Sequence, residues 1–588
     1  MQTRLLPAAT LLALLALAPW LASAAEIKVE VKGVDGALRD NVLAFLSLSR
    51  FSGFDELDQD MVDRLARRAE REAAQALRPF GYYGPTVAVQ TEPVAGGWKA
   101  VVSVDPGEPV VLVAADVRVT GPGQAEPFFA SALAGSALKP GQRLSHSAYE
   151  QTKGDLQRTA ASHGYLDASW KRAELAVDVD RLEARATLEL ETGERYRFGP
   201  TTVEQGFLDP GLVQRYLRYR EGDWYDATEL LRTQFALDDS EYFSVVEVLP
   251  QPRDRAAKVA PIRIAAQRNN RHRYRVGVGY ATDTETRVRL GWTDRQFNRR
   301  GHRLTAEATY ANIEQGIELG YTIPWKDPAL EKLAFTIRTG QRDEGDVETT
   351  GTSLYAGLTE VLGRWQRVLF ASLDYVEDRL PIEPRIAGSE PVSRRSTLIV
   401  PGISYALLPP GFLRAADVGR GLYAELSGST GVLGSDSDFV RLVVRDERRL
   451  PLGGPWHLLL RGEVGTSAVG DFQELPAKYR FFTGGDRSVR GYGYQELSPT
   501  DAEGNKIGGR HMLAVSAEIE RELPRNLAVA AFVDAGNAFD KFGDDLEYSV
   551  GLGLRYRLPF VSVGVDVAQS ISDSSQSPRL HLNFTPIL

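Results

Sequence analysis

The second half of the chain alternates between apolar and polar side chains over many short segments. From residue 273 the apolar set is Tyr274, Val276, Val278 and Tyr280, with arginine or glycine between them. Successive side chains of an extended segment point to opposite faces, so this period predicts β-strands with one apolar and one polar face. The period returns at 288–292, 304–310, 317–323, 333–338, 456–464, 513–520, 527–536, 548–558 and 561–568.

The distribution of charged and aromatic side chains favours a barrel in lipid over a soluble sandwich. A sandwich would bury its apolar faces in a core shared by two sheets. Here the polar face carries arginine, glutamate and aspartate beside glycine, and aromatic side chains lie at strand ends on the apolar face. A polar lumen, an apolar outer face and aromatic girdles are typical of transmembrane barrels. At about 10 residues per strand plus connections, residues 268–588 predict a transmembrane β-barrel of about 16 antiparallel strands.

The first half of the chain contains a repeat of about 80 residues. Its markers are the segments 80–83, 163–166 and 242–245, which read FGYY, HGYL and YFSV. A helical stretch precedes each marker, at 61–77, 147–161 and 226–238, and two strands follow it. In the third helix Leu230, Leu231, Phe235 and Leu237 are expected to share an apolar face. We predict three tandem α+β modules over 26–106, 107–192 and 193–267; the alternative is one irregular α+β domain with chance similarity.

Residues 1–25 have the features of a signal peptide. Arg4 precedes an apolar stretch over 11–17, and Ala22-Ser23-Ala24 fits the small-x-small cleavage pattern. The apolar stretch is short for a permanent membrane helix, although an uncleaved anchor is the alternative. The remaining chain is therefore expected to leave the cytoplasm.

Composition argues against two classes of function. The net charge of −9 is spread without a basic block, which disfavours nucleic acid as a partner. The sequence contains no cysteine, no H-E-x-x-H, no nucleotide-binding P-loop and no G-x-S-x-G motif. We therefore expect no enzyme activity, no cofactor and no metal site.

A glycine-rich segment over 483–494, TGGDRSVRGYGY, is the most unusual motif of the chain. Arginine in such a loop requires an acidic partner and an enclosed place. Strand alternation points Glu518 and Asp534 into the lumen, where the planar fork of Arg490 could bind both carboxylates. Tyr492 is expected to pack on Gly551 and Gly553. The hypothesis is a structural latch inside the barrel; the alternative is a solvated outer loop.

These features together resemble the BamA/TamA outer-membrane assembly superfamily, whose N-terminal repeats are called POTRA domains and which includes the two-partner-secretion transporters. Val489-Arg490-Gly491-Tyr492 matches the family's (V/I)RG(F/Y) signature in the sixth extracellular loop. Asp534 matches the family's FxDxG strand motif, and Glu518 lies where a strand glutamate is expected. The C-terminus departs from the pattern, because it reads FTPIL instead of ending on an aromatic residue.

The resemblance implies an outer-membrane location with the POTRA domains in the periplasm. It also implies that these domains receive unfolded outer-membrane proteins or autotransporters, and that an elongated TamB-like protein, anchored in the inner membrane, is the partner. Clients would leave sideways into outer-membrane lipid through a lateral seam between the first and last strands. A pore that exports one dedicated protein, as in two-partner secretion, is the alternative. The seam residues would be Tyr274, Val276, Val278, Leu580, Leu582 and Phe584.

Overall fold

The computed structural model of this chain describes residues 26–50, 58–95, 97–283, 285–380, 392–408, 421–558, 561–573 and 575–586. The predicted signal peptide lies outside these ranges. Within them, no helix is both long and apolar enough to cross a bilayer.

Three small sheets, each with helices, form the N-terminal region, as the repeat predicts. The strand orders are β1-β3-β2, β4-β6-β5 and β7-β9-β8, so the middle strand of each sheet is the last in sequence. The elements are β1 (Glu26–Lys32), α1 (Gly36–Phe45), α2 (Gln59–Leu77), β2 (Thr86–Val94), β3 (Gly97–Asp105), β4 (Val111–Thr120), α3 (Pro127–Ala134), α4 (His146–Ser162), β5 (Ser169–Asp178), β6 (Glu183–Glu191), β7 (Arg197–Glu204), α5 (Pro210–Gln214), α6 (Ala227–Asp238), β8 (Phe243–Pro250) and β9 (Val259–Arg268).

The repeat markers share one backbone feature. Gly81 and Gly164 end the segments after α2 and α4 with φ angles of 89° and 88°. Glu241 stands at the equivalent place after α6 and also has a positive φ, 59°. A left-handed residue therefore ends the helical segment at the same position in all three modules. The exact bounds of the modules stay a prediction.

The expected apolar face of the third helix is partly wrong. Leu230 and Leu237 are buried, but Leu231 and Phe235 are 50% and 53% exposed. With 3.6 residues per turn, positions 230, 233 and 237 form one stripe, and positions 231 and 235 form the next. Only the first stripe of α6 is buried.

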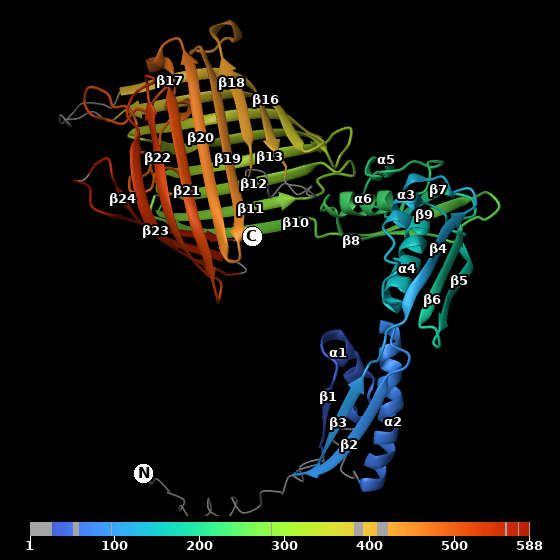
Figure 1. Cartoon of the computed structure of the whole chain (residues 1–588). Coiled ribbons are helices and arrows are strands. Elements are labelled where there is room, and N and C mark those ends of the chain that lie inside the picture. The colour runs from blue at the N-terminus through green and yellow to red at the C-terminus, as the bar shows by residue number, and fades with distance from the viewer. Residues whose placement is uncertain are drawn as a thin grey trace, which may run out of the picture. The chain divides into compact units, whose positions relative to one another are not determined.

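The C-terminal region is a barrel of sixteen antiparallel strands, which confirms the predicted fold class (Figure 1). Its strands are β10 (His272–Ala281), β11 (Glu285–Asp294), β12 (Arg303–Ala311), β13 (Glu314–Pro324), β14 (Glu331–Glu344), β15 (Val347–Leu362), β16 (Trp365–Leu380), β17 (Val392–Leu407), β18 (Tyr423–Ser429), β19 (Phe439–Gly453), β20 (Trp456–Val469), β21 (His511–Leu523), β22 (Leu527–Phe539), β23 (Glu547–Arg557), β24 (Val561–Ser570) and β25 (Arg579–Pro586).

Burial in the barrel is inverted relative to a soluble protein. Tyr274, Val276 and Val278 are exposed on its outer face, whereas Glu520 and Asp534 are fully buried on the inner side. An apolar exterior around a polar interior is what a barrel in lipid requires. The alternation seen in the sequence therefore sorts side chains between membrane and lumen.

Part of the third module packs with the barrel in one compact unit, which contains residues 201–220, 229–251 and 262–588. The turn between β11 and β12 makes several of the contacts. The hydroxyl of Tyr242 donates to the carbonyl of Gly301, and the side chain of Gln296 donates to the carbonyl of Phe207 at 2.8 Å. Arg218 also donates to Asp327, in the turn after β13, at 3.0 Å. These turns are therefore the docking points of α5 and its neighbouring loops.

Candidate lumen latch and barrel seam

The segment between β20 and β21, which we call loop six, folds into the barrel. Thr483 and Leu497 exchange backbone hydrogen bonds of 3.0 and 2.9 Å, which close the loop around the motif. Val489 and Tyr492 are buried with Leu497 in a small apolar cluster. Gly491 has a φ of 95°, and a Cβ there would lie 3.3 Å from Ser549 and from the backbone of Ser570. Glycine is thus required at this close approach to the barrel wall.

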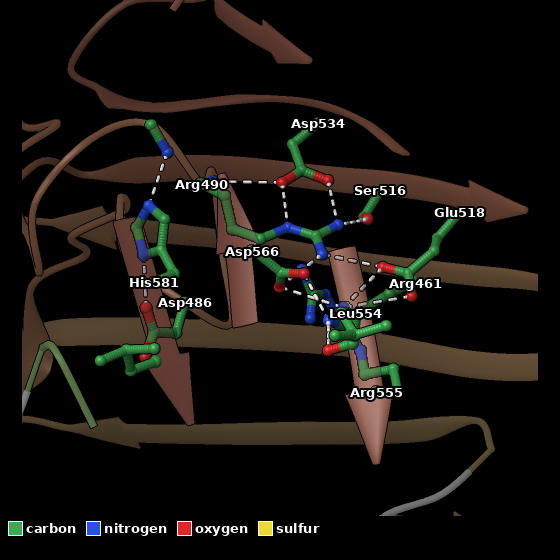
Figure 2. A network of polar contacts seen from close by, with 12 residues as sticks. Arg461, Asp486, Arg490, Ser516, Glu518, Asp534, Leu554, Arg555, Asp566 and His581 are labelled. Atoms are coloured by element: carbon green, nitrogen blue, oxygen red, sulfur yellow. Dashed lines mark hydrogen bonds and ion pairs between the residues drawn. The ribbon is translucent and has the colours of Figure 1, made fainter. Parts of the chain in front are cut away.

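Arg490 is 3% exposed and lies among carboxylates of the barrel wall (Figure 2). Its Nε and Nη2 donate to the two oxygens of Asp534 at 2.8 and 3.0 Å. Its Nη1 donates to Glu518 at 2.8 Å and to Asp566 at 3.3 Å, and Nη2 also reaches Ser516 at 3.2 Å. Every N–H of the guanidinium therefore has an acceptor. The structure brings together the three residues that the sequence paired.

Two further members of this network were missed from the sequence. Arg555 on β23 donates to Asp566 at 3.0 Å and to Glu518 at 3.3 Å, so the two arginines share two carboxylates. Asp566 alternates with Val565 and Val567 on β24, and Arg555 with Leu554 and Tyr556 on β23. The same alternation that pointed Glu518 inward therefore also places both side chains on the inward face, but it does not single them out as partners of Arg490.

Tyr492 lies at a different part of the wall from the one predicted. Its hydroxyl donates to Glu547 at 2.6 Å and lies 2.6 Å from the hydroxyl of Ser570. The atoms nearest to the place that a Cβ would occupy at Gly551 and Gly553 belong to Phe532, Val567, Asp566 and Arg555. The glycines of β23 make room for these wall side chains, and the phenol of Tyr492 instead reaches a polar site at the ends of β23 and β24.

The seam between β10 and β25 is closed by only a short stretch of strand pairing. β10 pairs with β11 along its whole length, but among the described residues its ladder with β25 consists of Ala281 and Asn583. Beside that pair, the Thr282 N–H donates to the Leu582 carbonyl and the Leu582 N–H to the Thr282 hydroxyl, both at 3.1 Å. Within the ranges that the structure describes, no β25 residue pairs with the predicted seam residues of β10, which are Tyr274, Val276 and Val278. Those of β25, Leu580, Leu582 and Phe584, pair with Val567, Val565 and Val563 of β24.

Loop six also contacts both seam strands. The carboxylate of Asp486 accepts hydrogen bonds from the Thr282 hydroxyl, at 3.2 Å, and from the ring of His581 on β25. The backbone N–H of Gly491 donates to Nε2 of His581 at 2.9 Å. These partners assign the neutral tautomer with the proton on Nδ1, facing Asp486. Sequence reasoning missed this group, because a histidine on an apolar-looking last strand gives no sign of its partner.

Asp283, Asp486 and His581 offer donor atoms within 4.8 Å of one another, a spacing that could hold a metal ion. The hydrogen bonds argue against that use in the present state. Nδ1 of His581 carries the proton that it donates to Asp486, and a metal ligand must be deprotonated. We therefore describe the three side chains as a hydrogen-bonded clasp.

Comparison with known proteins agrees with this architecture. Residues 416–585 match the model of the Omp85 superfamily domain, and residues 28–106 match that of POTRA domain TamA domain 1. The outer membrane protein assembly factor BamA of Nitratidesulfovibrio vulgaris is 35% identical over 140 residues, which cover 22% of this chain and 17% of that protein. BamA of Neisseria meningitidis serogroup B is 32% identical over 131 residues, 21% of this chain and 16% of the relative.

These matches therefore span about a sixth of the length of the curated relatives. The fold similarity extends further. The crystal structure of BamA from Haemophilus ducreyi lacking POTRA domains 1–3 aligns with a TM-score of 0.66 at 16% identity, over 81% of this chain and 99% of that one. Together with the three sheets, the barrel and loop six, the matches show that this chain is similar to the BamA/TamA superfamily, in its first N-terminal module and in the last part of its barrel.

Proposed function

We propose that this protein is a TamA-like assembly factor, which inserts outer-membrane proteins or autotransporters through the seam between β10 and β25. The observation that carries the proposal is the seam itself, where Ala281 pairs with Asn583 and, in the described part of the chain, the rest of β10 lacks a β25 partner. A strand edge with unpaired N–H and C=O groups can pair with another chain. Opening this seam disrupts far fewer backbone hydrogen bonds than opening any other strand pair of the barrel.

In this proposal loop six is a latch with no catalytic role. Arg490 joins the loop to three strands, through Glu518 on β21, Asp534 on β22 and Asp566 on β24. A buried charge pair is costly to break on one side, since the remaining charge stays uncompensated. The latch would keep the seam half of the barrel rigid while the β10 edge opens.

The POTRA domains would lie in the periplasm and receive unfolded clients. The match of residues 28–106 to the first TamA POTRA model supports a TamA-like branch, and with it a TamB-like partner anchored in the inner membrane. Co-purification of such a partner with the full chain, and its loss when residues 28–106 are deleted, is the expected result. Retention of the partner without this segment would contradict the assignment.

Locking the seam tests the main proposal. The chain contains no cysteine, so the substitutions Ala281→Cys and Asn583→Cys introduce one defined pair at the observed ladder position. We expect the oxidised protein, reconstituted in liposomes, to lose client insertion, and reduction to restore it. The rate at which a client barrel becomes protease-resistant is the measurement.

Each single-cysteine variant serves as the control, because it carries the same substitution without a crosslink. Full insertion by the oxidised double variant would contradict lateral release. If the locked barrel still conducted a substrate through its lumen, a dedicated export pore would be the better description.

A further inference from the structure

A cavity of about 990 Å³ lies in the barrel lumen against β10 and β11 and beside loop six. Ten arginine or lysine side chains and six aspartate or glutamate side chains line it. The excess of cations stands out in a protein whose net charge is −9. A partly enclosed excess of one charge is stabilised by a ligand of the opposite charge.

The strand pair β10–β11 supplies the cationic wall. Arg275 lies opposite Gly291, Arg289 opposite Gly277, and Arg287 opposite Gly279. Across this pair, therefore, each of the three arginines faces a glycine where a carboxylate would neutralise it. Glu307 on β12 is shared by two of them, 3.2 Å from Arg289 and 4.0 Å from Arg275.

Among the described residues, four cations of the cavity form no ion pair: Arg287, Arg445, Arg480 and Arg487. Arg445 lies over the ring of Tyr423, and Arg480 donates to backbone carbonyls, which leaves Arg287 and Arg487 as the two considered for a ligand. Arg287 forms no ion pair there, and its buried Nε has no hydrogen-bond acceptor. Arg487 of loop six likewise forms no ion pair with a described carboxylate and lines the same cavity. Guanidinium groups present planar pairs of donors that match phosphate oxygens.

The position of the cavity beside the seam limits the kind of ligand. The inner face of β10 contributes Arg273 and Arg275 to the cavity, and its outer face exposes Tyr274, Val276 and Val278. At the unpaired edge of β10, the inner and outer faces of the barrel wall are separated only by this one strand. A molecule with an anionic head and an apolar tail could contact both faces at this edge.

We propose that the β10–β11 arginine wall binds a phosphate group, either the headgroup of an anionic lipid reached through the unpaired part of the seam or a free phosphate in the lumen. The site is defined by Arg275, Arg287, Arg289 and Arg487. It is separate from the latch around Arg490, and it does not depend on the proposed assembly function.

Lipid binding to the purified full chain tests this site. We expect native mass spectrometry in detergent to show retention of phosphatidylglycerol in preference to diacylglycerol, which has the same tails without phosphate. The double substitution Arg287→Gln/Arg289→Gln should weaken this retention at least about tenfold, because charge-assisted contacts are lost. Raised salt should weaken it as well.

The matched control is Arg379→Gln/Arg395→Gln, which removes two barrel arginines that pair with Glu377 and do not line the cavity. It should leave phosphatidylglycerol retention unchanged. Unaltered heat-modifiability of both double variants on gels would show that the barrel is folded.

Inorganic phosphate distinguishes the two sources. If millimolar phosphate fails to displace phosphatidylglycerol, the ligand is the lipid headgroup. If phosphate alone binds and the variant Arg287→Gln/Arg289→Gln loses that binding, the ligand is the free anion. An equal loss of phosphatidylglycerol retention in the two double variants would overturn the proposed site. Preferential binding of an acidic peptide would also overturn it, because the wall would then recognise a polypeptide.

Discussion

Arg490 shows how one side chain can join a loop to several strands. Its side chain spans carboxylates on β21, β22 and β24, and its planar guanidinium lies over Phe532, 3.2 Å from the ring centroid. Lysine could supply the charge but not the fork. We therefore expect the geometry at this position to matter as much as the charge.

The substitution Arg490→Met should destabilise the barrel by about 3–5 kcal/mol, since Asp534 and Glu518 would remain buried without their counter-charge. Arg490→Lys should recover part of the loss. The temperature at which the folded band disappears on gels is the measurement. Arg364→Met is the control, because Arg364 lies in the exposed turn between β15 and β16 and does not line the cavity. An unchanged transition for Arg490→Met would contradict the latch.

The sequence predicts the Arg490 site well because alternation fixes which strand residues face the lumen. Glu518 and Asp534 follow from that rule and from the family motif. Alternation does not give the register of distant strands, so Asp566 and Arg555 could not be ranked above other inward charges. The predicted contact of Tyr492 with Gly551 and Gly553 was wrong for a related reason. Strand periodicity does not indicate how far a loop extends into the lumen.

At the scale of elements, the clasp between loop six and the seam is the contact to test. His581→Ala removes the hydrogen bonds to Asp486 and Gly491. We expect roughly tenfold faster hydrogen exchange at the amides of Thr282 and Leu582, because exchange there reports how often the seam opens.

Two conservative variants separate the two bonds of His581. His581→Asn can still donate near Asp486, and His581→Gln can still accept from Gly491. Each should lose only part of the protection. If all three variants exchanged like the parent protein, the clasp would not hold the seam.

The turn between β11 and β12 is a second sensitive element. Gly301 has a φ of 74°, and a Cβ there would lie 2.5 Å from Leu212 and 2.7 Å from the Tyr242 hydroxyl. Gly301→Ala should therefore loosen α5 on this turn at a cost of about 1–3 kcal/mol. Faster hydrogen exchange over residues 208–216 is the expected result.

Gly363→Ala is the matched control for Gly301→Ala. Gly363 also has a positive φ, 64°, but no atom outside its immediate neighbours lies within 4 Å of the place that a Cβ would occupy. The variant Gly363→Ala should lose only the stability that a non-glycine residue costs at a positive φ. Equal effects of the two substitutions would mean that packing on α5 contributes nothing.

At the scale of the whole molecule, Asp167 connects the second and third modules. Its carboxylate accepts from the Tyr196 hydroxyl at 2.6 Å and from Arg253 and Lys258 at 2.9 and 3.1 Å. The Tyr196 hydrogen bond, with those of Lys258 and Arg253, lowers the pKa of Asp167 to about 2. Because the folded-state pKa is depressed, its stabilisation is present above the ordinary pKa of 3.8 and is lost as the pH falls toward 2.

Asp167→Asn should therefore weaken this junction at neutral pH by about 1 kcal/mol, a value reduced for partial exposure to solvent. The difference between the variant and the parent should disappear as the pH is lowered from 4 to about 2. Hydrogen exchange over residues 253–258 gives the measurement. Asp180→Asn, in an exposed turn, is the control. A difference independent of pH would contradict the assignment to this carboxylate.

The fold of the whole molecule follows from the two-residue alternation of the barrel strands and from the repeat of about 80 residues in the first half. The third module shows the limit of that inference. Alternation predicted the barrel, and the repeat predicted three similar sheets. The apolar residues Leu231 and Phe235 of α6 were assigned to a core they do not enter, since adjacent stripes of a helix are hard to separate by pattern alone. Contacts such as that of Tyr242 with Gly301 depend on turns whose conformation is not encoded by periodicity.

The contact that closes the barrel also has a meaning for the protein's own folding. Thr282 and Leu582 are 300 residues apart in the chain, so bringing them together closes a very long loop. Such contacts carry the largest loop-closure cost, and they form after the local hairpins that the rest of the barrel consists of. The first and last strands should thus meet only at the end of folding. The newly made barrel would pass through an open state resembling the one that we propose for its work on other proteins.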